Sequence, residues 1–326
     1  MTRIAPALAA AVAALTIAVH ATQQPPDVSA FKSIAGKEKK AHSQTTIVSP
    51  PLTAAESKVM LGKIQAVRQA LLATSAMQTL YGFDWTTLGG IAGHETGRPL
   101  TARLGVIAYP YFFNARLNRA ESSAEGAPFT IYLNDPDIVL GNHGYHVDEK
   151  ARFTFTPEPA GVLDGFPVYS ADDHFVVMTR DARPIYAAVT EQQYLDLRIA
   201  QASKSLDEFK SSLAQMPDSP AKSAAVGKFV ARLSGLEGEL AAMPDAQRRS
   251  PALDPDGAPT KRPSMLAEVG ARKTRAIVMP NPDLFDPKKP RTSVQVIVLG
   301  SIRYQPELFR QVQAQIDKAA LAALLD

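Results

Sequence analysis

Two histidines and an aspartate stand close together near the middle of the chain and form its candidate metal site. His143, His146 and Asp148 combine two imidazoles with a carboxylate, a set that binds zinc or another divalent ion and leaves a position for water. His174 is a further candidate ligand if its strand pairs suitably. Because residues three apart face opposite sides of a strand, only a turn at Gly144 would bring the two rings together. The alternative is a polar hairpin loop with solvated histidines, so we assign no metal, no cofactor and no catalytic residue.

Other short motifs in the sequence lack residues that a catalytic or cofactor-binding pattern requires. His94-Glu95 begins like the zinc-protease helix motif, but Arg98 stands where that motif needs its second histidine. The oxygen-rich residues 134–137 could suit calcium, yet no closing Glu follows at the required spacing, and Asx turns explain them more simply. The chain also lacks a Gly-x-Ser-x-Gly elbow, a phosphate-binding glycine loop and a dinucleotide fingerprint.

Composition excludes several further classes of function. Cysteine is absent from the 326 residues, which rules out disulfides, thiolate catalysis and iron–sulfur clusters. Thirty-five basic residues nearly balance 32 acidic ones, and a formal charge of +3 gives no general case for nucleic-acid binding. Apolar residues make 45% of the chain, so core packing alone is able to hold a fold of this length.

The first 21 residues have the layout of a secretory signal peptide. Arg3 precedes an uncharged, mostly apolar run over residues 4–19, and Val19 and Ala21 then offer a cleavage site. The run is shorter than the ~20 residues that a membrane-spanning helix needs, although an uncleaved N-terminal anchor is the alternative. We expect a signal peptide over residues 1–21, export to the periplasm or the cell exterior, and no membrane span in the mature chain.

Residues 22–52 carry two proline pairs and lack apolar periodicity, so we expect a flexible lead-in. The lysine run within it, residues 37–40, is either a solvated tail or an attachment to an anionic surface. Order is expected from Thr53, which can form a capping box with Glu56. Apolar residues then recur every three or four positions, which predicts a helix to about Leu80.

Residues 82–189 show the short alternating pattern of β-strands. Phe153 and Phe155, for example, alternate with polar neighbours, as in a half-buried antiparallel strand. Residues 294–299 are apolar on both faces, which predicts a central, covered strand. A last helix is expected from Pro306.

Two helices of similar length are predicted over residues 190–244. Thr190 and Gln193 form a second capping box, and Pro220 suits the first turn of the second helix. Each helix has an apolar stripe at heptad spacing, as in a coiled coil, so we expect a long antiparallel helical hairpin. Each stripe can be satisfied by the other arm, so binding to another chain would need a second apolar face.

The order of these elements predicts an α+β fold with a mostly antiparallel sheet and flanking helices. We expect one domain over residues 53–326, with the helical hairpin as an insertion at about 190–244. A Pro-rich loop is expected at about residues 245–290, within which residues 277–279 pair briefly.

Two stretches of the chain also carry a resemblance. One comprises Gly165-Phe166-Pro167-Val168-Tyr169, Thr179-Arg180, Pro184 and residues 190–195, and the other Asn281-Pro282, Phe285-Asp286-Pro287 and Gln295. Together they resemble a family of uncharacterised exported bacterial proteins with no assigned activity. The resemblance covers about a quarter of the chain. It implies a shared fold and export, and it transfers no catalytic residue.

We therefore expect a non-catalytic binding or interaction protein of the bacterial envelope. Its expected contact surfaces are an apolar sheet groove near Trp85 and residues 109–113, and the region 248–291, where ten basic residues accompany five acidic ones. The alternatives are core packing for the aromatic residues and a solubilising loop for the basic region.

Two other functions stay open. One is a metal-dependent hydrolase in which His143, His146 and Asp148 hold an ion that ionises water as the nucleophile. The other is an assembly factor that acts through the helical hairpin. The partner and the ligand are not specified by the sequence.

Overall fold

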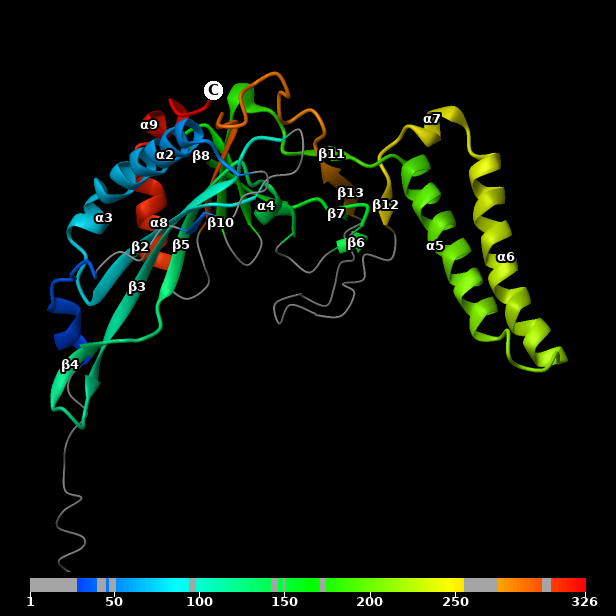
Figure 1. The fold of residues 1–326 in the computed structure, drawn as a ribbon, viewed down its shortest axis with the longest axis horizontal. Coiled ribbons are helices and arrows are strands. Elements are labelled where there is room, and N and C mark those ends of the chain that lie inside the picture. Colours follow the sequence, from blue (N-terminus) through cyan, green and yellow to red (C-terminus); the bar gives the residue numbers. More distant parts are fainter. Residues whose placement is uncertain are drawn as a thin grey trace, which may run out of the picture.

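The computed structural model describes residues 28–39, 45–46, 51–93, 98–141, 146–148, 150–170, 174–254, 275–300 and 306–326. These residues form a mixed α+β fold, in which a mostly antiparallel sheet is flanked by helices and a helical hairpin projects to one side (Figure 1). The predicted fold class is confirmed.

The first helices form where capping and periodicity predict them. α2 (Ala54–Leu72) follows Thr53, whose hydroxyl accepts a hydrogen bond from the Glu56 N–H while the Glu56 carboxylate accepts one from the Thr53 N–H. Such a cap stabilises a helix by about 1 kcal/mol. The short α3 (Ser75–Gln78) ends the helical stretch. Four residues on one face of α2 are buried: Met60, Ile64, Val67 and Leu71.

The larger sheet brings together strands from both ends of the chain. Its order begins with β1 (Thr45–Thr46), β2 (Phe83–Ile91), β3 (Ala102–Asn114) and β5 (Ala127–Leu133), and β4 (Arg119–Ser122) pairs with the end of β3. It continues with β14 (Val296–Gly300), β10 (His174–Thr179), β9 (Phe166–Ser170) and β8 (Glu158–Leu163). All five residues of β14 are buried, between β5 and β10, which confirms the predicted central strand.

Two hydrophobic cores cover the two faces of this sheet. On one face, α2, α3, α8 (Pro306–Gln315) and α9 (Lys318–Ala322) bury the main core. Phe129 of β5 and Phe309 of α8 are fully buried there and stack with their ring centroids 5.2 Å apart. Burial of one such side chain stabilises the fold by about 1.5–3 kcal/mol. On the other face, β10 and β14 pack beneath α4 (Asp137–Gly141).

A smaller sheet connects the body to the helical hairpin. Its order is β11 (Tyr186–Ala188), β13 (Arg275–Pro280), β7 (Phe153–Phe155) and β6 (His146–Asp148), and β12 (Leu253–Asp254) pairs with β13. Residues 277–279 pair as expected, with β7 and β11. Phe153, Val189, Ala252 and Ile277 form its own small core.

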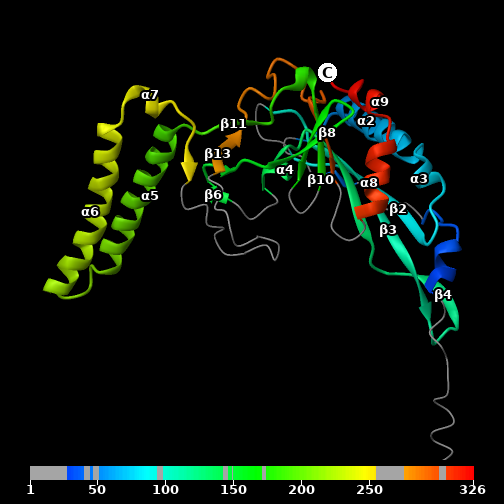
Figure 2. The same cartoon turned by 180° about the vertical axis from the view of Figure 1, so that it is seen from behind.

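The helical hairpin consists of α5 (Glu191–Ser212) and α6 (Pro220–Ala242), followed by the short α7 (Asp245–Arg248). Thr190 and Gln193 form the predicted capping box, and Ser219 caps α6 with Pro220 in its first turn. At 1.5 Å per residue the arms are roughly 33 and 35 Å long. Both views show the hairpin standing clear of the large sheet (Figures 1 and 2).

The described part of the predicted lead-in lies along the edge of β2. The 3₁₀-helix η2 (Val28–Ser33) precedes bridges from Ala35 to Tyr81 and from Glu38 to Trp85, and β1 then pairs parallel to the end of β2. The lead-in therefore covers an edge that would otherwise expose unpaired backbone groups.

The part of the chain that the structure describes has no helix both long and apolar enough to cross a bilayer.

Candidate functional site

The predicted metal ligands are divided between the two sheets. His146 and Asp148 lie on β6 of the smaller sheet, whereas His174 begins β10 of the larger one. Both carboxylate oxygens of Asp148 accept hydrogen bonds, Oδ1 from the Ala151 N–H at 2.6 Å and Oδ2 from the Gln201 amide at 2.7 Å. Asp148 therefore fastens the turn between β6 and β7 to α5.

His143 lies outside the described residues, and so does His94. Within the described ranges, no three His, Asp or Glu side chains lie close enough together to hold a metal ion. The site formed by His143, His146 and Asp148 stays a prediction.

The aromatic residues noted in the sequence lie on opposite faces of the large sheet. Trp85 is half-buried and packs against the main core on the side of the helices. It pairs with Ala108, which is also in that core, so Tyr109 and Tyr111 alternate to the other face. Core packing is therefore the role of Trp85, and it does not share a surface with the two tyrosines.

Asp84 holds the lead-in against β2 and β3. Its Oδ1 accepts hydrogen bonds from the Tyr111 hydroxyl at 2.5 Å and from the Lys37 N–H at 3.1 Å. Burial and the Asp84 carboxylate raise the pKa of Tyr111 to about 12. Burial acts against ionisation of Asp84, but the hydrogen bonds outweigh it and lower the pKa of this carboxyl. The Lys39 ammonium lies 4.1 Å from the Tyr109 ring centroid, which adds a cation–π contact.

A second group of charges surrounds the start of α4. The Asp135 carboxylate accepts backbone hydrogen bonds from Asp137 and Ile138, while burial, followed by the charge of Asp137, raises the pKa of Asp135. Asp137 pairs with Arg152 and lies 4.0 Å from the Arg98 guanidinium. A carboxyl with a raised pKa beside an ionised one is how some general acids are built. Here, however, Asp135 accepts backbone N–H groups at the start of α4, and Oδ2 of Asp137 binds arginines. The buried Oδ1 of Asp137 has no hydrogen-bond partner among the described residues.

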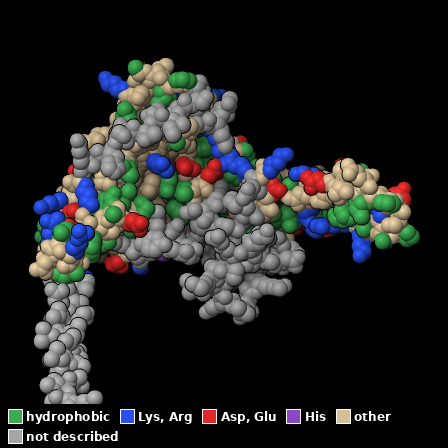
Figure 3. Space-filling view, turned by 60° about the horizontal axis from the view of Figure 1, so that its bottom comes forward, with side chains coloured by type: hydrophobic (Ala, Val, Ile, Leu, Met, Phe, Trp, Pro, Cys, Tyr) green, Lys and Arg blue, Asp and Glu red, His purple; other side chains and the backbone are tan. Residues whose placement is uncertain are grey.

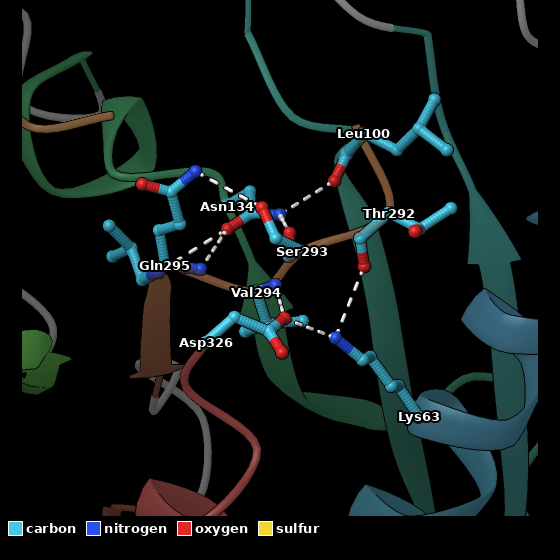
Figure 4. A network of polar contacts seen from close by, with 9 residues as sticks. Lys63, Leu100, Asn134, Thr292, Ser293, Val294, Gln295 and Asp326 are labelled. Carbon is cyan, nitrogen blue, oxygen red and sulfur yellow. Dashed lines mark hydrogen bonds and ion pairs between the residues drawn. The ribbon is translucent and has the colours of Figure 1, made fainter. Parts of the chain in front are cut away.

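Asn134 joins three separate segments at the end of β5. It is 3% exposed and has a left-handed φ of 59°. Its amide donates to the carbonyl oxygens of Leu100 at 2.9 Å and Ser293 at 2.7 Å, and its Oδ1 accepts from the N–H groups of Gln295 and Val296 (Figure 4). Sequence reasoning placed Asn134 only in a turn, because its partner Val296 is 162 residues away.

Beside this network, Asp326 ties the end of the chain to α2 and to the segment before β14. Its Oδ2 lies 2.5 Å from the Lys63 ammonium and accepts the Val294 N–H at 2.7 Å (Figure 4). Lys63 also donates to the Thr292 carbonyl oxygen at 3.2 Å. These polar contacts hold α2, residues 292–294 and Asp326 together.

The inner faces of the hairpin helices are filled by their mutual contact. Leu195 and Ala202 of α5 pack with Leu236 of α6 and Met243 beyond it. Near the far end, the rings of Phe209 and Phe229 stack with their centroids 4.7 Å apart. The predicted apolar stripes are therefore used within the hairpin itself.

The outer face of α6, turned away from α5, is built from small and apolar residues. An open recess of about 500 Å³ near the turn of the hairpin reaches onto this face at Gly227 and Ala231. Val230 beside this recess is 43% exposed, and Met216 in the turn is 55% exposed. The recess is lined by Asp218, Lys222, Ser223, Val226, Gly227, Val230 and Ala231.

Glycines give this outer face its unusual character. Gly227, Gly235 and Gly238 lie inside α6, and a Cβ added to any of them would meet nothing within 4 Å. Each such glycine costs an exposed helix about 1 kcal/mol relative to alanine. The sequence alone indicates only scattered alanines on this face. The three glycines can be assigned to one surface only when the orientation of α6 relative to α5 is known.

The fold and this surface define a mixed α+β protein with a projecting helical hairpin that offers a small-residue face. Comparisons of the chain with protein-family models, with curated proteins and with solved structures gave no match. The resemblance to an exported bacterial family, and export itself, stay predictions.

Proposed function

We propose that this chain is an exported, non-catalytic binding protein of the bacterial envelope that holds a protein partner on the outer face of α6. The observation that carries this proposal is the open recess of about 500 Å³ that reaches onto that face, with Val230 exposed in its lining. Exposed apolar side chains around a recess are a common feature of protein-binding surfaces.

The small residues of α6 support a close helical contact. The hairpin seam is already filled by residues of the inner faces, so the outer face is not needed to hold the two arms together. Glycine lets a second backbone approach a helix closely, because it has no Cβ to keep the partner away. The cost in helix stability is then offset by packing in the complex.

The attachment of the hairpin to the body leaves its far end accessible. At the base, the Glu191 N–H donates to the Ser250 carbonyl oxygen at 2.9 Å, and Thr190 bridges to Pro251. Gln201, halfway along α5, makes the contact with Asp148. The recess lies beyond this point, near the turn between the helices.

The test places a photoreactive amino acid at Ala231, inside the recess, and at Gly62, on the exposed side of α2, in cells that produce the protein. Gly62 is a matched control because an added side chain there also meets nothing within 4 Å. We expect a discrete protein adduct from position 231 and none from position 62. The partner so identified is then purified and its binding to the chain is measured.

Filling the recess should abolish this binding without unfolding the hairpin. Gly227→Leu introduces a better helix former and a bulky side chain, so we expect at least about a tenfold loss of affinity with helicity retained. Gly62→Leu should bind normally. Unchanged affinity of Gly227→Leu would overturn the proposed surface. Turnover of ester, phosphate or peptide substrates that is lost on replacing His143 and His146 by Ala would overturn the non-catalytic function.

A further inference from the structure

The far end of the long strands β2 and β3 carries a second exposed surface, distant from the hairpin (Figure 1). We call it the arm tip and define it as Lys32, Tyr81 and residues 112–121. Its large apolar side chains face solvent: Tyr81 is 53%, Phe112 46% and Leu117 48% exposed. In the space-filling view, hydrophobic and basic side chains gather at this end (Figure 3).

The register of the strands explains why these side chains point outward. Phe113 pairs with Ala120 and stacks on Phe31 of η2, with the ring centroids 6.4 Å apart. Phe112 alternates to the opposite face. Tyr81 directly precedes Gly82, whose carbonyl oxygen accepts the Tyr111 N–H. One aromatic ring thus anchors the lead-in, while two others remain at the surface.

Basic residues accompany the apolar ones. Lys32, Lys37 and Arg116 are exposed on the arm or on the lead-in against it. The nearby acids Glu38 and Glu121 are paired, with Arg68 at 2.6 Å and with Arg119 at 2.7 Å. Exposed Glu125 and the Asp84 carboxylate next to Lys37 are left to oppose these cations. An apolar tip that carries more cations than unpaired acids complements a bilayer whose headgroups are anionic.

The N-terminal segment joins the structure at this same end. The chain enters the described residues at Val28, and η2 is held to β3 by the stack of Phe31 on Phe113. Only residues 20–27 separate this point from the apolar run over residues 4–19. Eight extended residues span at most about 28 Å. While the apolar run is in a membrane, Val28 at the start of η2 is therefore within that distance of the lipid surface.

We propose that the arm tip docks on an anionic lipid bilayer, with Phe112, Leu117 and Tyr81 in the interface and Lys32, Lys37 and Arg116 on the headgroups. Aromatic and aliphatic side chains are favoured at this depth, and basic side chains add electrostatic attraction. This docking leaves the helical hairpin free. The lipid contact is therefore independent of the proposed function, and each of the two proposals can be tested separately.

The experiment uses the chain from Thr22, the predicted mature form, which retains every described residue. Flotation is measured with vesicles of phosphatidylcholine and with vesicles that contain 30% phosphatidylglycerol. We expect binding only to the anionic vesicles, and its loss in 0.5 M salt. Arg116→Glu reverses one charge and should weaken binding by at least about tenfold. Phe112→Ser combined with Leu117→Ser should weaken it at least as much.

The control variant combines Met216→Ser with Val230→Ser, which removes two exposed apolar side chains from the hairpin instead. It should bind vesicles normally. Because the chain has no cysteine, Leu117→Cys and Met216→Cys each accept one environment-sensitive fluorophore. Its emission should shift to the blue on anionic vesicles at position 117 and stay constant at position 216.

Three results would overturn the proposal. They are absence of binding to anionic vesicles, binding that the arm-tip variants leave unchanged, and a fluorophore at position 117 that stays in water. Equal binding to a soluble polyanion and to vesicles, without the blue shift, would identify an acidic polymer in place of lipid.

Discussion

Phe209 of α5 stacks on Phe229 of α6, with their ring centroids 4.7 Å apart and their planes 24° from parallel. The pair lies near the turn of the hairpin, beyond the buried Leu195, Ala202 and Leu236 that hold its base. Stacking of this kind contributes beyond simple area burial. The ring pair therefore holds the two arms together in the part of the hairpin that carries the recess.

Removing one ring should loosen the far end of the hairpin selectively. We expect Phe229→Ala to cost about 1.5 kcal/mol locally, because Phe229 is only half-buried. Amide hydrogen exchange in residues 205–230 should then be about tenfold faster, with the strands of the large sheet unaffected. Val230→Ala changes the adjacent, outward-facing residue and should leave exchange nearly unchanged. Equal acceleration in both variants would show that the ring pair is not what closes the hairpin.

Asn134 should be one of the residues most sensitive to substitution. Asn134→Ala leaves the carbonyl oxygens of Leu100 and Ser293 and the Gln295 N–H without their partner in a buried site. It also places alanine at φ 59°. Alanine lacks the side-chain carboxamide that makes Asn tolerant of a left-handed backbone. We expect a loss of about 3 kcal/mol, and a fall in Tm of about 5 °C for a chain of this length.

The control for this prediction is Asn118→Ala. Asn118 also has a left-handed backbone, with φ 49°, but it lies exposed in the turn after β3. Only the conformational cost applies there, about 1 kcal/mol. Calorimetry that gave both variants the same Tm would show that the Asn134 side-chain bonds contribute nothing to stability.

Local signals in the sequence predict the helices well. Thr53 with Glu56 and Thr190 with Gln193 form their capping boxes, because the partners of a cap are three residues apart. The hairpin follows from the same local periodicity and a turn before Pro220. Residues 294–299 could be placed in a central strand because a strand buried on both faces needs apolar residues at every position.

Pairing between distant segments is what the sequence could not specify. Phe153 and Phe155 have the predicted alternation, but nothing local indicates that β7 pairs with β13 in a separate small sheet. The face occupied by Trp85 depended on its register with Ala108. The sequence predicts the hairpin that carries the candidate site. The small-residue face can be recognised only when the rotation of α6 about its own axis is known.

Glu56 links α2 to the segment before β14 and should make the fold sensitive to acid. Its two carboxylate oxygens accept bonds from Arg291 at 2.5 and 2.7 Å, and this contact holds the pKa of Glu56 well below its usual range. A lowered pKa in the folded state stabilises the protein above the pKa of the unfolded chain, about 4.3. The stabilisation is lost progressively as the pH falls below that value.

Glu56→Gln keeps the capping acceptor but removes the charge. Wild type should therefore have the higher Tm at pH 7 and pH 5, and the difference should narrow at pH 4 and more at pH 3. Thermal scans at these four pH values measure it. A difference that is the same at pH 3 and at pH 7 would contradict an ionised Glu56–Arg291 pair as its source.

Gly36 allows the lead-in to lie against the edge of the large sheet. Its N–H donates to the Leu80 carbonyl oxygen at 2.8 Å, and a Cβ at this position would lie 2.1 Å from the Phe83 carbonyl oxygen. Gly36→Ala must therefore push the lead-in away from β2. We expect trypsin to cleave after Lys37 and Lys39 about tenfold faster, because a backbone clash favours the open form.

The matched control is Gly62→Ala, in which the added Cβ meets nothing within 4 Å and helix propensity improves. Its cleavage in the lead-in should match that of wild type. An uncovered β2 edge also offers free backbone groups to other chains, so Gly36→Ala should aggregate more readily on warming, which light scattering measures. If Gly36→Ala resisted trypsin as well as wild type and stayed equally soluble, the lead-in would not be what protects this edge.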